Sequence, residues 1–195
     1  MAGKTRWLAR QLHQERVPIS QRPESADDRS TPGHWEADYM LFSRYGDNVL
    51  VAHERSTRLV LLALPPNRKA TQTAKALATL IGPWPPGMRI TLTMDNGTEF
   101  AHHHHLAQQL GIKTFFCDPH APWQKGGVEN AIGRLRRYLP RNTDLANLTP
   151  DQLNAIAARI NNTPRKCLDF KTPAEACSNL ALHFEWESTS PLSRG

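Results

Sequence analysis

The chain has 195 residues, with 24 Lys and Arg against 18 Asp and Glu, and so carries a net charge of +6 at pH 7. This length fits one folded domain with short extensions and excludes two full domains. A hydrophobic content of 39% with 22% charged residues excludes wholesale disorder. The basic surplus favours an anionic partner, and nucleic acid is the commonest one.

Hydropathy and cysteine usage bear on the compartment. No run approaches the roughly 20 apolar residues of a membrane helix, and the N-terminus lacks the apolar centre of a secretion signal. Cys117, Cys167 and Cys177 are an odd number at wide spacing, which is no disulfide framework. We therefore expect reduced thiols in a cytoplasmic protein that has no membrane partner.

The N-terminal part of the chain is polar and then turns apolar. We expect a short basic helix over 1–14 and a linker over 20–32, where prolines flank acidic residues. Three apolar-rich runs with short gaps then predict the strands of a meander. They cover 34–42, 48–53 and 58–64.

Helices and strands alternate in the remainder of the chain. Apolar residues at i, i+4, i+7 and i+11 predict a helix over 70–81, and alternation predicts a strand over 88–94. Thr98 is a candidate N-cap for the next helix, which Gly111 ends. The later elements are a strand over 112–117, a helix that follows the pair Gly126-Gly127 and is ended by Pro140, and helices over 149–161 and 172–182. This order predicts an α/β fold with a mixed five-stranded sheet flanked by helices.

Three carboxylates occupy positions where functional sites are commonly built. Asp38 lies inside the first strand among apolar residues, where a charge is costly unless it has a partner or a task. Asp95 ends the strand over 88–94 and Glu129 lies early in a helix, and ligand sites gather at such strand ends and helix starts. Each acid alone also fits a structural role, as a solvent-facing strand residue, a turn residue or a first-turn acid.

Together the three acids indicate a site for hard divalent cations. Carboxylate oxygens suit Mg²⁺ and Mn²⁺, and two such ions can hold the attacking and leaving oxygens of a phosphoryl displacement. We therefore expect two Mg²⁺ (or Mn²⁺) ions as cofactors. The candidate metal ligands and catalytic residues are Asp38, Asp95 and Glu129.

The helix that carries Glu129 is amphipathic and basic. Its apolar residues recur at a helical spacing and predict a buried stripe, made of Val128, Ile132, Leu135 and Leu139. Positions 124–141 hold five basic residues against Glu129 alone, a net charge of +4. A basic helix beside an acidic site is suited to a phosphate backbone.

The strings around the acids have a familiar pattern. They are GHWEADYM, TMDNGTEF and DPHAPWQKGGVENAIGRLRRYLP, followed by INNTPRKCLDFKTPAEA, with 56 and 33 residues between successive acids. Over 32–176 the chain resembles the catalytic core of bacterial transposases of the insertion-sequence-thirty family, within the Asp-Asp-Glu transposase and retroviral-type integrase group. The resemblance implies a ribonuclease-H-like fold and an integrase-type catalytic core over 32–182. Residues 1–31 and 183–195 are then an N-terminal segment and a C-terminal tail.

The resemblance also assigns roles to residues of this chain. The three acids match the family's metal-binding acids, and Asp38 is expected to bridge both ions. The basic residue two helical turns after Glu129 matches Arg136, and its neighbours in the motif are expected to bind DNA. The full set of expected DNA contacts is Trp123, Gln124, Lys125, Asn130, Arg134, Arg136 and Arg137.

Two further groups are weaker candidates for a metal site. His102 to His105 are consecutive on a predicted helix and point around it, whereas metal-binding histidines converge. Cys117 and His120 have the spacing of one half of a zinc site, but no second pair lies nearby. We expect neither group to bind a metal.

The resemblance implies a metal-dependent polynucleotidyl transferase. Water would cut the phosphodiester at the element end, and the freed 3′-hydroxyl would attack target DNA. A homo-oligomer on double-stranded DNA, at the nucleoid of the bacterial cytoplasm, is expected. Two alternatives stay open: a ribonuclease-H-like nuclease without strand transfer, and a truncated, non-catalytic DNA-binding regulator. The second arises because 31 residues before the core cannot hold the helix-turn-helix domain usual in this family.

Overall fold

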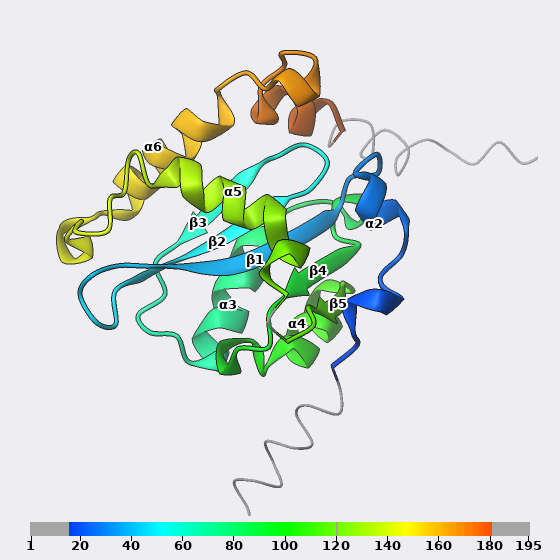
Figure 1. Ribbon diagram of the computed structural model, residues 1–195, viewed down its shortest axis with the longest axis horizontal. Helices are drawn as coiled ribbons and strands as arrows, with labels where there is room; N and C mark the ends of the chain where they lie inside the picture. Colours follow the sequence, from blue (N-terminus) through cyan, green and yellow to red (C-terminus); the bar gives the residue numbers. More distant parts are fainter. Residues whose placement is uncertain (1–15, 120, 181–195) are drawn as a thin grey trace, which may run out of the picture.

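The computed structural model describes residues 16–119 and 121–180, and its centre is a mixed five-stranded sheet of order β3-β2-β1-β4-β5 (Figure 1). The strands are β1 (His34–Leu41), β2 (Asn48–Glu54), β3 (Val60–Ala63), β4 (Thr91–Met94) and β5 (Lys113–Phe116). The first three pair antiparallel as a meander, and β4 and β5 run parallel to β1. The predicted five-stranded mixed sheet is confirmed.

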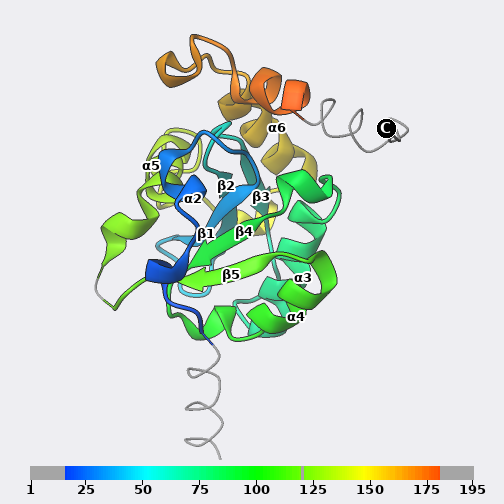
Figure 2. The same cartoon turned by 90° about the vertical axis from the view of Figure 1, so that its right-hand side faces the viewer.

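Helices cover both faces of this sheet (Figure 2). One face carries α3 (Ala70–Ile81) and α4 (His103–Leu110), and the other carries α5 (Gly126–Leu135) and α6 (Pro150–Asn161). Another helix covers 173–180. The shorter helical segments are η1 (Ile19–Gln21), α2 (Ser25–Asp28), η2 (Pro86–Met88), η3 (Thr98–Phe100), η4 (Pro122–Lys125), η5 (Leu145–Asn147) and η6 (Lys166–Leu168). None of the helices in the described residues is long and apolar enough to span a membrane.

The sheet divides the interior into two cores, and β1 contributes to both. Trp35, Ala37 and Tyr39 pack into the core beneath α3 and α4, while Met40 packs into the core beneath α5 and α6. Successive side chains of a strand point to opposite faces, so Asp38 shares the face of Met40. The central strand therefore presents Asp38 to the side of the sheet that α5 covers.

Several predicted boundaries move in the structure. The strand predicted over 88–94 begins at Thr91, because Met88 is fully buried in the turn η2. Thr98 does not cap a helix through its side chain; it starts η3, where burial of Phe100 holds the chain in a tighter turn before α4 begins. The third strand begins two residues late, because Arg58 has a positive φ of 64° that extended backbone does not allow. Likewise, α5 ends at Leu135 rather than at Pro140.

Residues 16–32 pack against the domain instead of forming the expected linker. Pro18 forms a parallel bridge to Phe116, whose backbone N–H donates to the Val17 carbonyl at 2.9 Å. Ala26 in α2 is fully buried, and Arg22 donates to Thr93 Oγ1 in β4 at 2.9 Å. The basic helix predicted over 1–14 lies outside the described residues.

Candidate active site

The parallel pairing of β1 and β4 brings two of the candidate acids together. Glu36 pairs with Thr93 in the register, and Asp38 and Asp95 each follow two residues later. One oxygen of each carboxylate is fixed by the local backbone: Asp38 Oδ1 accepts the Tyr39 N–H at 2.7 Å, and Asp95 Oδ1 accepts the Gly97 N–H at 2.9 Å. Asp38 and Asp95, called the acid pair below, each have Oδ2 left for another partner.

That partner is Lys125, which lies at the start of α5. Its Nζ donates to Asp38 Oδ2 at 2.8 Å and to Asp95 Oδ2 at 3.0 Å, and its side chain is only 5% exposed. Burial alone would lower the pKa of Lys125, but the charges of Asp38 and Asp95 outweigh it and raise the pKa above its ordinary value. The ammonium is therefore a charged bridge between two carboxylates.

Glu129 lies outside this bridge. It is an exposed residue in the first turn of α5, and its carboxylate makes no hydrogen bond or ion pair with any residue that the structure describes. It follows Lys125 by four residues, which places it about one helical turn further along the same side. The structure thus brings Asp38 and Asp95 together, and Glu129 lies about one helical turn beyond Lys125 without contacting either of them.

A buried carboxylate fixes the start of α5 against β1. Glu36 is fully buried, and its Oε2 accepts the Val128 N–H at 2.7 Å while its Oε1 forms an ion pair with Arg55. Gly127 is required beside it, because a Cβ there would lie 2.7 Å from Glu36 Oε2 and 2.9 Å from His53 Nδ1. Glu36 therefore holds the helix that carries Lys125 and Glu129.

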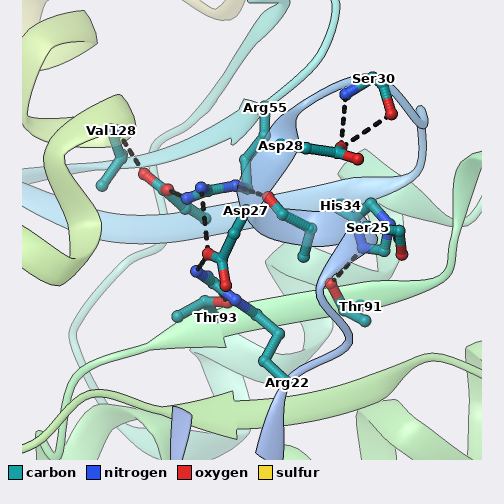
Figure 3. A network of polar contacts seen from close by, with 12 residues as sticks. Arg22, Ser25, Asp27, Asp28, Ser30, His34, Arg55, Thr91, Thr93 and Val128 are labelled. Carbon is teal, nitrogen blue, oxygen red and sulfur yellow. Dashed lines mark hydrogen bonds and ion pairs between the residues drawn. The ribbon is translucent and has the colours of Figure 1, made fainter. Parts of the chain in front are cut away.

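The same network reaches the N-terminal segment. Arg55 Nε donates to the Ala26 carbonyl at 2.6 Å, and both Arg55 and Arg22 form ion pairs with Asp27 in α2 (Figure 3). Because Arg22 also contacts Thr93, two residues before Asp95, the network joins α2, β1, β4 and α5. Sequence analysis missed Glu36 and Arg55. An acid two residues before Asp38, and hence on the same face of the strand, was the available signal.

His53 completes this buried region. Its Nδ1 has no hydrogen-bond partner among the described residues, and the residue is 2% exposed. Burial, followed by the charges of Arg58 and Arg55, lowers the pKa of His53 to about 3. The imidazole is therefore neutral at physiological pH, surrounded by arginines.

The acid pair has the donor chemistry of a divalent-cation site. Two carboxylate oxygens already converge on one positive charge, and such oxygens are the ligands that Mg²⁺ and Mn²⁺ prefer. Within 16–119 and 121–180, no group of three or more His, Cys, Asp or Glu side chains is arranged to hold a metal ion. The acid pair fits a cation, and Glu129 as a third ligand stays a prediction.

The expected DNA contacts fall into two groups. Trp123 is 73% exposed, and Arg134 and Arg137 are exposed on or just after α5, so all three are accessible to a ligand. The other side chains make local contacts: Gln124 donates to Asp118 Oδ2 at 2.9 Å, and Asn130 donates to the Gly126 carbonyl at 2.8 Å.

Arg136 also makes intramolecular contacts. Its guanidinium donates to the Leu41 carbonyl at 2.5 Å and lies 5.0 Å from the Phe42 ring centroid. These contacts hold the end of α5 against the end of β1. A DNA contact by Arg136 stays a prediction.

The weaker metal candidates acquire structural explanations. His103 is buried and shares a hydrogen bond of 2.9 Å with Thr114 Oγ1; burial, followed by the charge of His104, lowers the pKa of His103 to about 4. Cys117 is a buried free thiol whose pKa burial raises to about 11, and His120 lies outside the described residues. All three cysteines are free.

Comparison with curated proteins shows which proteins this chain is similar to. The transposase for IS1086 of Cupriavidus metallidurans is 39% identical over 168 residues, which cover 84% of this chain and 48% of the relative. The transposase InsI for IS30A of Escherichia coli K12 is 36% identical over 82% of this chain and 41% of the relative. The chain is a homologue of insertion-sequence transposases. The transposase for IS4351 of Bacteroides fragilis, 34% identical over 82% of this chain and 49% of the relative, agrees.

Two solved structures share the fold of this chain. The catalytic core domain of BIV integrase superposes with a TM-score of 0.60 and 24% identity, over 79% of this chain and 98% of that domain. The simian T-cell lymphotropic virus intasome in complex with PP2A regulatory subunit B56 gamma superposes with a TM-score of 0.58 and 20% identity, over 85% of this chain and 57% of that chain. The fold is ribonuclease-H-like, as expected. The chain spans less than half the length of the three curated relatives, and no protein-family model matches it.

Proposed function

We propose that this chain forms the catalytic core of a DNA transposase, with 32–182 as the catalytic domain. It hydrolyses a phosphodiester at the element end. The 3′-hydroxyl released there then attacks a target phosphodiester, which joins the element's 3′ end to the target strand and releases the target's own 3′-hydroxyl. The observation that supports this function best is the acid pair, held on adjacent strands and converging on one positive charge in a homologue of transposases. Polynucleotidyl transfer needs such carboxylates together with basic residues for the phosphates.

In this proposal Asp38, Asp95 and Glu129 hold two Mg²⁺ or Mn²⁺ ions. When bound, such ions lower the pKa of a water and neutralise charge on the phosphate. Asp38 and Asp95 supply oxygen ligands from the sheet, and α5 carries Glu129 toward them. The Val128 N–H donates to Glu36 Oε2 at 2.7 Å, and this bond keeps the start of α5 beside β1.

We also propose the partners and the place of action. Double-stranded DNA, as element end and target, lies along the exposed basic residues Arg134 and Arg137 and beside the exposed ring of Trp123. Pairing of two element ends favours a homo-oligomer on DNA. Its substrate places the protein at the nucleoid of the bacterial cytoplasm.

A nicking assay tests the enzyme. The protein is incubated with Mg²⁺ or Mn²⁺ and a labelled duplex that carries the terminal sequence of its own element, beside Glu129→Gln and Asp38→Asn. Each substitution is expected to lower the nicking rate on the order of 10²–10³-fold, the usual cost of losing one group that stabilises transition-state charge. Asp151→Asn is the matched control, because Asp151 is an exposed acid in the first turn of α6.

The outcomes separate the alternatives. Metal-dependent nicking followed by joining to a target plasmid supports the transposase. Nicking without joining supports a ribonuclease-H-like nuclease. DNA binding without cleavage by the wild-type chain, under either metal, contradicts the enzyme and supports a DNA-binding regulator.

A further inference from the structure

Lys125 occupies the position that a divalent ion bound to the acid pair requires. Its Nζ lies 2.8 and 3.0 Å from the two Oδ2 atoms that carry no backbone hydrogen bond. A Mg²⁺ ion bound to the same two oxygens lies at about 2.1 Å from each. Nζ and the ion cannot share this space, and two cations this close repel each other strongly.

The acid pair also needs a counter-charge when no metal is bound. Asp38 lies in β1 and Asp95 directly follows the adjacent strand β4, and the Asp38 side chain is only 22% exposed, so two unneutralised carboxylates would repel each other there. Another cation close to Asp95 is Arg16, which donates to the carbonyls of Asn96 and Gly97. Among the described residues, Lys125 is the cation in ion pairs with both acids.

We propose that Lys125 and the divalent ion compete for the acid pair: the lysine neutralises and aligns the two carboxylates before metal binds, and the ion displaces it. This inference rests on the proposed function, because it takes the acid pair as the metal site. Lys125 is thereby a positioning residue for the metal-free state. The free energy of metal binding then includes the cost of displacing Lys125 from the acid pair.

The position of Lys125 in the chain gives the displacement a structural consequence. Lys125 is the N-cap residue of α5, and Glu129 lies one turn later. Release of Lys125 therefore removes one of the contacts that hold the first turn of α5, while the bond from the Val128 N–H to Glu36 remains. The displaced ammonium remains beside the acid pair, where a DNA phosphate is expected, so one lysine serves both states.

Metal binding without DNA tests the competition. Mn²⁺ binding to the full chain is measured from the spin-resonance signal of free Mn²⁺, for the wild type and Lys125→Met. We expect Lys125→Met to bind Mn²⁺ at least about tenfold more tightly, within the usual range of coupling between two ligands. Lys113→Met is the matched control, since Lys113 is an exposed lysine in β5 with no ion pair to any described residue. Equal or weaker binding by Lys125→Met overturns the proposal.

A second measurement uses the wild-type chain, in case Lys125→Met does not fold. The rate of acetylation of Lys125 by acetic anhydride is followed by peptide mass spectrometry, with Lys113 as the internal reference. The buried, doubly bonded amine is expected to react slowly without metal and several-fold faster with saturating Mn²⁺. No increase relative to Lys113 contradicts displacement.

Asp38→Asn and Asp95→Asn distinguish failure of this inference from failure of the proposed function. If both variants bind Mn²⁺ as the wild type does, the acid pair is not the metal site and both proposals fail. If both lose Mn²⁺ binding while Lys125→Met stays at the wild-type affinity, only the competition fails.

Discussion

Ionisable side chains are buried where β1, β2 and the start of α5 meet, and most of them form ion pairs. Glu36 pairs with Arg55, and Lys125 pairs with the acid pair. His53 differs because it has arginines and no acid among the charges that shift its pKa. A neutral histidine in this place makes stability depend on pH.

We expect the free energy of unfolding to fall as the pH is lowered through the ordinary pKa of histidine. His53 keeps a pKa of about 3 when folded, so below about pH 6.5 the unfolded chain binds a proton that the folded chain rejects. Between pH 7 and pH 5 the protonation of His53 in the unfolded chain costs about 2 kcal/mol of stability. His53→Gln should remove this share of the loss and leave the share that comes from the buried His103. Urea unfolding at both pH values measures the loss. His105→Gln, at an exposed position, should keep the wild-type loss, and an equal loss in His53→Gln contradicts the expectation.

At the scale of elements, α5 begins beside the acid pair, directly after Lys125. It contains three glycines, Gly126, Gly127 and Gly133. They differ in what surrounds them. Nothing lies within 4 Å of a Cβ built on Gly133, whereas one on Gly127 meets Glu36 and His53. Only Gly127 is therefore explained by close packing against β1 and β2.

Alanine at these positions is expected to have opposite effects. Gly133→Ala should stabilise the protein by up to about 1 kcal/mol, because glycine is a poor helix former. Gly127→Ala should destabilise it by about 1–3 kcal/mol, since Glu36 is held by Arg55 and Val128 and cannot yield freely. Thermal unfolding of both variants measures these changes. A stabilised Gly127→Ala would show that α5 does not need the close approach of Gly127 to Glu36 and His53.

Periodicity in the sequence located most elements, because burial on one face imposes it. It predicted β1 and α3 nearly to the residue, and the buried stripe of α5 at Val128 and Leu135. It failed where tertiary contacts decide the backbone, as in the turn η3, where burial of Phe100 replaces the expected helix start.

The site was predictable in part for the same reason. Strand position and spacing identified Asp38 and Asp95, whose proximity the parallel register confirms. The bridge from Lys125 joins residues 87 and 30 positions apart, and no local pattern encodes such a contact. Glu36 was overlooked because a glutamate in a sequence does not by itself show whether it is buried or exposed, and only its spacing from Asp38 indicated its face of the strand.

At the scale of the whole molecule, the segment before β1 is part of the structure that supports the site. It contributes Arg22 to β4 and Asp27 to Arg55, and Arg55 in turn holds Glu36. The support of α5 therefore begins in the residues that compositional analysis treats as a linker. Composition failed here because Arg22 and Asp27, which form an ion pair in the structure, look in the sequence like residues of a solvated segment.

Ala26→Lys in the full chain distinguishes a packed segment from a linker. A lysine in a linker is harmless, but Ala26 is fully buried and its carbonyl accepts from Arg55, so the added side chain and charge should destabilise the protein by about 3 kcal/mol. Gln21→Lys, at an exposed position of η1, is the matched control and should leave the urea midpoint unchanged. Because Arg55 would lose its alignment with Glu36, Mn²⁺-dependent nicking should also fall at temperatures where Ala26→Lys is still folded. Unchanged stability in both variants would mean that the segment before β1 supports neither the fold nor α5.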